Sequence, residues 1–228
     1  MKGFYENEVR CQVCKKEYKI TKLLSRKVVV KKRDSDFCPH YKDLNPIFYS
    51  VSVCPHCGFT SFNSYEEKLN SQEIKKYKEK MNGKWKYQEL NGVKEIDDAI
   101  KIYKLLLLTY NVIDEKKSSI AKACLRLAWL YRYKDDKENE MKYLKSMIKN
   151  NEIAFSTENL SVNYKNELEI MFIVGETYRK LGEFKESVKW FTKVNAHEDI
   201  NKHRIIKVRN KEQWSLAMQE YRNSDKNE

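Results

Sequence analysis

Four cysteines near the start of the chain have the spacing of metal ligands. They form two Cys-x-x-Cys pairs, Cys11 with Cys14 and Cys54 with Cys57. Two sulfurs on one tight turn can reach a single ion, and two such turns supply the four tetrahedral thiolates of structural Zn²⁺. Gly58 follows the second pair and suits the left-handed backbone that turns N–H groups toward sulfur. The sequence therefore predicts a structural zinc site with these four ligands.

Other uses of paired cysteines remain open from the sequence. Four thiolates also bind iron. A thioredoxin-like redox pair lies at a helix start within a βαβ unit, and the sequence contains no such pattern. Disulfides belong to oxidising compartments, whereas the start of the chain lacks the apolar run of a signal peptide, so we expect a cytoplasmic protein with reduced thiols. Because four cysteines leave no position for water, we expect the metal to shape its module without catalysing a reaction.

A fifth cysteine, Cys38, lies in a block that reads Arg-Asp-Ser-Asp-Phe-Cys-Pro-His. It could be an alternative metal ligand, a reactive thiol beside Arg33, or a buried thiol packed near the metal. His40 and His56 could also compete as ligands. Asp34 and Asp36 could act as a catalytic pair only in a cleft with a partner, and they are expected instead to cap a turn or pair with nearby cations. The candidate functional residues beside the metal ligands are therefore Arg33, Asp34, Asp36 and Cys38.

No catalytic residue is assigned from the sequence. It contains no glycine-rich phosphate loop, no His-Glu-x-x-His and no Gly-x-Ser-x-Gly. We expect a protein that is not an enzyme.

The net charge of +12 favours phosphates, nucleic acid or an anionic surface as partners. The excess is spread along the chain without a block of six like charges, which is more typical of a lysine-biased background than of a functional basic face. No apolar stretch approaches the length of a membrane span, so we expect no membrane partner.

The elements that must position these residues change character along the chain. Short β-rich runs at Lys27–Lys32 and Ile47–Val53 accompany the cysteines, and helical periodicity dominates from Ile96 onward. We predict an α+β fold, with a small zinc-ribbon-like β module followed by a mainly α-helical domain of tetratricopeptide-like repeats. The predicted parts are the module at 1–64, a charged, partly helical connector at 65–95, helical hairpins at 96–222 and a flexible tail at 223–228.

The helical part carries a repeat signal. The tetratricopeptide pattern needs small residues where two helices cross closely, aromatic residues at fixed offsets, and a glycine in the turn. The last hairpin meets that order with Gly175, Tyr178, Gly182, Ser187 and Phe191. Ala128 with Tyr131 and Ala99 with Tyr103 are partial copies. An ordinary helical bundle is the alternative.

Several segments resemble a bacterial family known as domain of unknown function 2225. The shared motifs are the Cys-x-x-Cys pair, the block from Arg33 to Pro39, Asn45-Pro46, and the Cys-Pro-x-Cys-Gly knuckle ending at Gly58; the helical resemblance lies in Cys124–Arg132 and Gly175–Phe191. His40 stands where the family pattern has an aromatic residue. The resemblance covers nearly the whole chain and implies a zinc-binding N-terminus and a helical-repeat C-terminus. It implies no biochemical activity, but it adds weight to Arg33, Asp34, Asp36 and Cys38.

Three functions follow from these patterns. The first is an adaptor that binds a protein or peptide in the groove of its helices, with candidate aromatic anchors at Trp129, Tyr133, Tyr143 and Trp190. The second is nucleic-acid binding, for which Lys27, Lys31, Lys32 and Arg33 lie in sequence near Tyr41 and Phe48. The third is a thiol sensor or enzyme centred on Cys38. We favour the adaptor.

Overall fold

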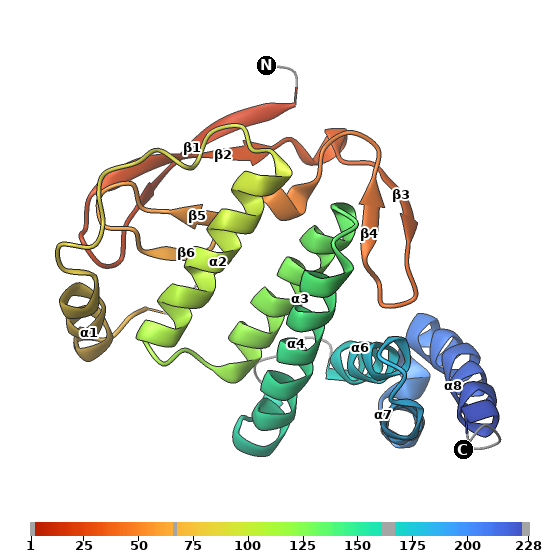
Figure 1. The fold of residues 1–228 in the computed structure, drawn as a ribbon. Helices are drawn as coiled ribbons and strands as arrows, with labels where there is room; N and C mark the ends of the chain where they lie inside the picture. The colour runs from red at the N-terminus through yellow and green to blue at the C-terminus, as the bar shows by residue number, and fades with distance from the viewer. Residues whose placement is uncertain (1–2, 66–67, 161–166, 225–228) are drawn as a thin grey trace. The chain divides into compact units, whose positions relative to one another are not determined.

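The computed structural model describes residues 3–65, 68–160 and 167–224, drawn as a ribbon in Figure 1. The chain folds into two compact units. Unit 1 comprises residues 1–31 and 41–150, and unit 2 comprises residues 32–40 and 151–228. Short strands come first and helices follow, which confirms the α+β class. The boundaries proposed at 64, 95 and 222 remain predictions, and residues 225–228 of the expected tail lie outside the described residues.

Two antiparallel hairpins in unit 1 carry the cysteine pairs. Strand β1 (Phe4–Arg10) pairs with β2 (Glu17–Leu23), and strand β5 (Val51–Val53) pairs with β6 (Thr60–Phe62). The first cysteine pair lies in the loop between β1 and β2, and the second lies between β5 and β6. Each Cys-x-x-Cys motif is therefore the tip of a hairpin.

The β-rich runs predicted from the sequence are strands only in part. The run at Ile47–Val53 begins instead within a 3₁₀ turn, η2 (Pro46–Tyr49). The side chain of Asn45 accepts a hydrogen bond from the Ile47 N–H at 3.0 Å, and Pro46 supplies the first fixed φ of the turn. Likewise, another 3₁₀ turn, η1 (Ser25–Lys27), precedes strand β3 (Val30–Arg33). Local capping by Asn45 overrides β propensity at η2, whereas η1 has no side-chain cap.

The described residues of unit 1 also form the helices α1 (Ser71–Met81), α2 (Ile96–Val112), α3 (Lys117–Tyr133) and α4 (Lys137–Thr157), which continues into unit 2. A capping box between Asn70 and Glu73 begins α1. Helix α2 contacts both β5 and β6. Its predicted apolar face is buried, which confirms the helical periodicity; it comprises Ala99, Ile100, Tyr103 and Leu106.

Unit 2 contains the helices α6 (Glu167–Lys180), α7 (Phe184–Ala196) and α8 (Arg204–Ser224), with a 3₁₀ turn η3 (Ile200–Lys202) before α8. Helix α6 packs on α7, and α7 packs on α8. Gly182, at a φ of 80°, makes the turn predicted after α6. A Cβ on Gly175 would lie 2.9 Å from Phe191 Cδ1, so only glycine allows this approach of α6 to α7.

Residues 32–40 of unit 2 form the end of a hairpin. Strand β3 pairs there with β4 (Pro39–Tyr41). Lys180 on α6 binds Asp36, and Arg209 on α8 donates to the backbone oxygen of Asp34. These two contacts attach the hairpin end to the helices of unit 2.

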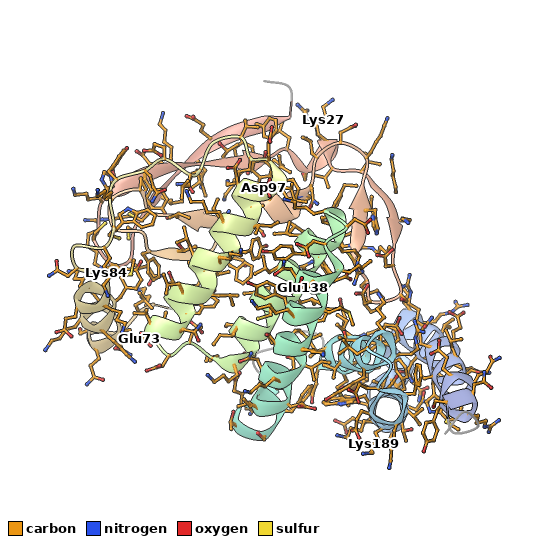
Figure 2. All side chains as sticks on the ribbon, viewed as in Figure 1. Lys27, Glu73, Lys84, Asp97, Glu138 and Lys189 are labelled. Carbon is orange, nitrogen blue, oxygen red and sulfur yellow. The ribbon has the colours of Figure 1, made fainter. Side chains whose placement is uncertain are left out.

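Charged side chains cover the surfaces of both units, as Lys27, Lys84 and Lys189 illustrate in Figure 2. This agrees with the even distribution of basic residues along the sequence. Among the described residues, no helix combines the length and the apolar composition that crossing a membrane would require.

Candidate metal centre

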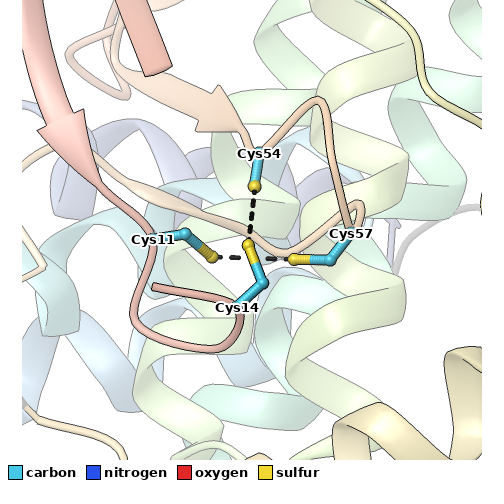
Figure 3. Close-up of side chains that lie close together, drawn as sticks. All are labelled: Cys11, Cys14, Cys54 and Cys57. Atoms are coloured by element: carbon cyan, nitrogen blue, oxygen red, sulfur yellow. Dashed lines mark hydrogen bonds between the residues drawn. The ribbon is translucent and has the colours of Figure 1, made fainter. Parts of the chain in front are cut away.

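The two hairpin tips of unit 1 face each other and bring four sulfurs together (Figure 3). The Sγ atoms of Cys11 and Cys57 are 3.6 Å apart, and those of Cys14 and Cys54 are 3.5 Å apart. All four Sγ atoms lie within 4.8 Å of one another, and none is in a disulfide. Four thiolates around one Zn²⁺ with bonds of about 2.3 Å would be about 3.8 Å apart, so the cluster has nearly the required size.

Backbone hydrogen bonds shape both tips in the same way. In the first, the Lys15 N–H donates to the Cys11 oxygen at 3.1 Å, and the Cys11 N–H donates to Lys16. In the second, the Gly58 N–H donates to the Cys54 oxygen at 2.8 Å, and the Cys54 N–H donates to Phe59. Two segments with little sequence in common thus fold into the same turn, because each must direct two sulfurs toward one point.

Both turns contain a residue in the left-handed region. Gly58 has a φ of 75°, as its position after the second cysteine pair predicts. Lys15 occupies the matching position with a φ of 64°. Sequence reasoning missed this equivalence because lysine rarely adopts such a backbone. The Lys15 ammonium donates to the Gln12 oxygen at 2.6 Å, across its own turn.

Trp85 fixes the second turn from outside the cysteine motifs. Its indole N–H donates to the Pro55 oxygen at 2.8 Å. A Cβ on Gly58 would lie only 2.4 Å from the indole ring. The glycine therefore serves two needs, the positive φ and the space for the ring. The segment expected to be a connector contributes this residue to the centre.

Asn91 is a second contributor that the sequence did not reveal. Its side-chain oxygen accepts from the Val53 N–H at 3.0 Å, and its amide donates to the Val53 oxygen at 2.7 Å. Its backbone oxygen accepts from the Thr21 N–H. Asn91 thus joins strands β2 and β5, directly before Cys54. Its position in an Asn-Gly pair suggested only a turn.

Hydrogen bonding among the thiols separates their acidities. Bonds from Cys54 and Cys57 stabilise a thiolate at Cys11 and lower its pKa to about 2. The bond to Cys11 raises the pKa of Cys57, and the bond to Cys54 raises it further. The thiolate of Cys11 is thus stabilised, whereas ionising a second thiol would place another negative charge beside it. A divalent cation would relieve this repulsion and allow further thiols to ionise.

The donor set fits a structural Zn²⁺. Cys11 and Cys54 are buried, and Cys14 and Cys57 are half-buried. No acidic or histidine side chain of the described residues belongs to the same cluster. Four sulfur donors at tetrahedral spacing leave no position for water. The arrangement can hold a metal and fix two hairpins against each other.

The block from Arg33 to Cys38 lies in unit 2. Cys38 groups with Asp34 and His40 and not with the four cysteines, and its side chain is fully buried. Asp36 is also fully buried. It accepts from the Cys38 N–H at 3.4 Å, so it caps its turn as expected from the sequence. Its ion-pair partner at 3.2 Å is Lys180 on α6, which is not one of the neighbouring cations that the sequence suggested.

Arg33 lies on a groove of unit 2 with a volume of about 670 Å³. We call it the unit 2 groove; its lining consists of Arg33, Phe37, Glu169, Lys202, His203, Arg204, Ile205, Ile206 and Arg209. Arg209 lies 4.8 Å from the centre of the Phe37 ring. Ile205 is 71% exposed, which is unusual for an isoleucine.

The aromatic residues proposed as anchors do not line this groove. Trp129 and Trp190 are buried core residues. Tyr143 stacks on Tyr131, with ring centres 5.5 Å apart. Cys124 is buried, as expected for a core residue, and burial raises its pKa to about 12.

The comparisons with known proteins agree with the resemblance carried by the cysteine motifs. No curated protein and no solved structure matches the chain. The family model described as an uncharacterized protein conserved in bacteria (DUF2225) matches residues 4–217, which include both cysteine pairs, the block from Arg33 and nearly all of the helices. The chain therefore belongs to the DUF2225 family.

Proposed function

We propose that this chain is a cytoplasmic zinc-binding adaptor that captures an acidic segment of a partner protein in the unit 2 groove. The four cysteines of unit 1 hold zinc in a structural role, with iron as the alternative for the same four thiolates. The role is binding and not catalysis. The observation that carries the proposal is an exposed apolar side chain, Ile205, in a groove whose lining is rich in cations.

Charge complementarity identifies the occupant. The lining carries four cationic side chains, Arg33, Lys202, Arg204 and Arg209, against the single carboxylate of Glu169. Lys202 already binds Asp199 at 2.6 Å. An acidic peptide would add carboxylates to this cationic lining, and an apolar residue within it would cover Ile205. The close packing of α6 on α7 at Gly175 supports a tetratricopeptide-like hairpin as the scaffold of the groove.

The two other functions are less well supported. The burial of Cys38 disfavours a thiol sensor, because a reactive thiol needs access to its oxidant. Nucleic acid has a specific observation in its favour, since β3 exposes Lys31 and Lys32 next to Arg33. The groove, however, offers an apolar surface at Ile205, which suits a peptide side chain better than a phosphate backbone.

Fluorescence anisotropy with a labelled peptide of alternating glutamate and leucine tests the adaptor. The wild-type chain should bind it, more weakly as salt rises. Arg33→Glu and Arg204→Glu should each weaken binding at least about tenfold, because each turns an attraction into a repulsion. Ile205→Ser should also weaken binding, with no change in its salt dependence.

Lys211→Glu is the matched control, because Lys211 is exposed on α8 but does not line the groove. It should bind the peptide like wild type. Equal weakening of peptide binding by Lys211→Glu and Arg204→Glu would show that binding depends on net charge alone. That result would contradict binding in the groove. Binding of single-stranded RNA without binding of the acidic peptide would favour the nucleic-acid function instead.

A further inference from the structure

A second group of metal-binding side chains lies in unit 2. A carboxylate oxygen of Asp34, the Sγ of Cys38 and a ring nitrogen of His40 all lie within 4.8 Å of one another. The Asp34 Oδ2 and His40 Nε2 atoms are 2.9 Å apart. Cys38 is fully buried, whereas the side chains of Asp34 and His40 are 24% and 29% exposed. The thiol therefore forms the inner end of the group, and the carboxylate and imidazole form its solvent side.

The local backbone explains why these three side chains converge. The Asp34 N–H donates to the Cys38 oxygen at 2.9 Å, which places the two residues opposite each other across the hairpin end. Phe37 closes the turn with a φ of 63°. His40 follows Cys38 by two residues and enters β4, so both side chains share one face of the strand.

Neighbouring residues of unit 2 hold this geometry. Arg209 donates to the backbone oxygen of Asp34 at 3.1 Å. Lys180 binds the carboxylate of Asp36, the other acid of the turn. Asp36 is thus held by Lys180, and the carboxylate grouped with the Cys38 thiol and the His40 ring is that of Asp34. The three donors are thus supported by both α6 and α8.

We propose that Asp34, Cys38 and His40 form a second metal site that binds Zn²⁺. Carboxylate oxygen, thiolate sulfur and imidazole nitrogen are the three ligand types that zinc accepts together. One thiolate and one carboxylate balance the charge of the ion. On binding, the Cys38 thiol releases its proton to solvent, and the proton that His40 Nε2 donates to Asp34 moves to Nδ1 or to solvent. The contact between His40 and Asp34 is then replaced by two bonds to the metal.

This site differs in kind from the four-cysteine cluster. Three protein ligands leave the fourth tetrahedral position to water or to an incoming donor. The partial exposure of Asp34 and His40 places that position toward solvent. The ion in unit 2 is therefore exchangeable and reachable by an external ligand, whereas the closed site in unit 1 is not. The inference is independent of the groove and its peptide.

Titration with Co²⁺ tests the second site in the full-length chain that retains zinc in its four-cysteine cluster after a chelator has removed exchangeable metal, because a thiolate bound to cobalt gives a charge-transfer absorption band. The wild-type chain should take up one further equivalent and develop this band. Cys38→Ser should lose the band. His40→Gln and Asp34→Asn should weaken cobalt binding at least about tenfold, since each removes one ligand.

His197→Gln is the matched control, because His197 is a half-buried histidine of unit 2 outside the group. It should bind cobalt like wild type. The proposal is overturned if the wild-type chain takes up no further equivalent, or if the band persists in Cys38→Ser. If Cys38→Ser fails to fold, the Asp34→Asn and His40→Gln variants decide the test, because both side chains are partly exposed. Unchanged cobalt affinity in both variants would then overturn the proposed site.

Discussion

At the residue scale, the two knuckles show how one backbone geometry tolerates different side chains. Lys15 and Gly58 occupy equivalent left-handed positions. The lysine is exposed and its side chain extends over its own turn, whereas the glycine lies under the indole of Trp85. The requirement for glycine therefore comes from the neighbour as much as from the φ angle.

Gly58→Ala should lower the free energy of unfolding by roughly 2 kcal/mol or more, because it adds left-handed strain and displaces Trp85. Lys15→Gly should remain within about 1 kcal/mol of wild type, since relief of strain offsets the added freedom of the unfolded chain. Urea unfolding of the zinc-loaded chain measures both. Equal stability of the two variants would contradict the role given to Trp85.

At the element scale, an ion-pair network joins α6 to α8. Arg179 binds Glu176 through two bonds of 2.9 Å and reaches Glu220 at 3.0 Å. Glu176 is fully buried. A buried carboxylate is tolerated only with such a partner, so the position of α8 on α6 depends on this arginine.

Arg179→Met should lower the free energy of unfolding by about 3–5 kcal/mol, because it leaves the Glu176 carboxylate buried without its arginine. The double variant Arg179→Met/Glu176→Met should recover most of that loss. Lys189→Met is the control at an exposed pair with Glu186, where about 0–1 kcal/mol is expected. Denaturant unfolding compares them, and similar losses for Arg179→Met and Lys189→Met would contradict the network's importance.

The sequence predicts elements well where one local rule decides and poorly where rules compete. The face of α2 around Tyr103 follows from helical period alone. The strand expected from Ile47 does not begin there, because Asn45 and Pro46 impose a 3₁₀ turn first. Strands β1 and β2 are not evident from the sequence, because their glutamates, asparagine and lysines dilute the alternation of apolar residues.

At the scale of the whole molecule, the cluster of four cysteines could be predicted from the sequence, but the distant residues that support the sites could not. Spacing within each Cys-x-x-Cys pair is local, so sequence alone reveals it. The bond between Arg209 and Asp34 joins residues 175 positions apart, and no periodicity encodes it. The same limit hid Trp85 and Asn91, whose contacts with Pro55 and Val53 form only when the chain folds back.

In the function that we propose, zinc bound by the four-cysteine cluster stabilises unit 1, since a structural ion of this kind contributes about 10 kcal/mol or more to folding. The zinc content of Cys54→Ser, measured by atomic emission beside wild type and Cys124→Ser, tests it most directly. Cys54→Ser should contain one equivalent less than both, because Cys124 is a buried core residue outside the cluster. An unchanged zinc content in Cys54→Ser would contradict the metal centre.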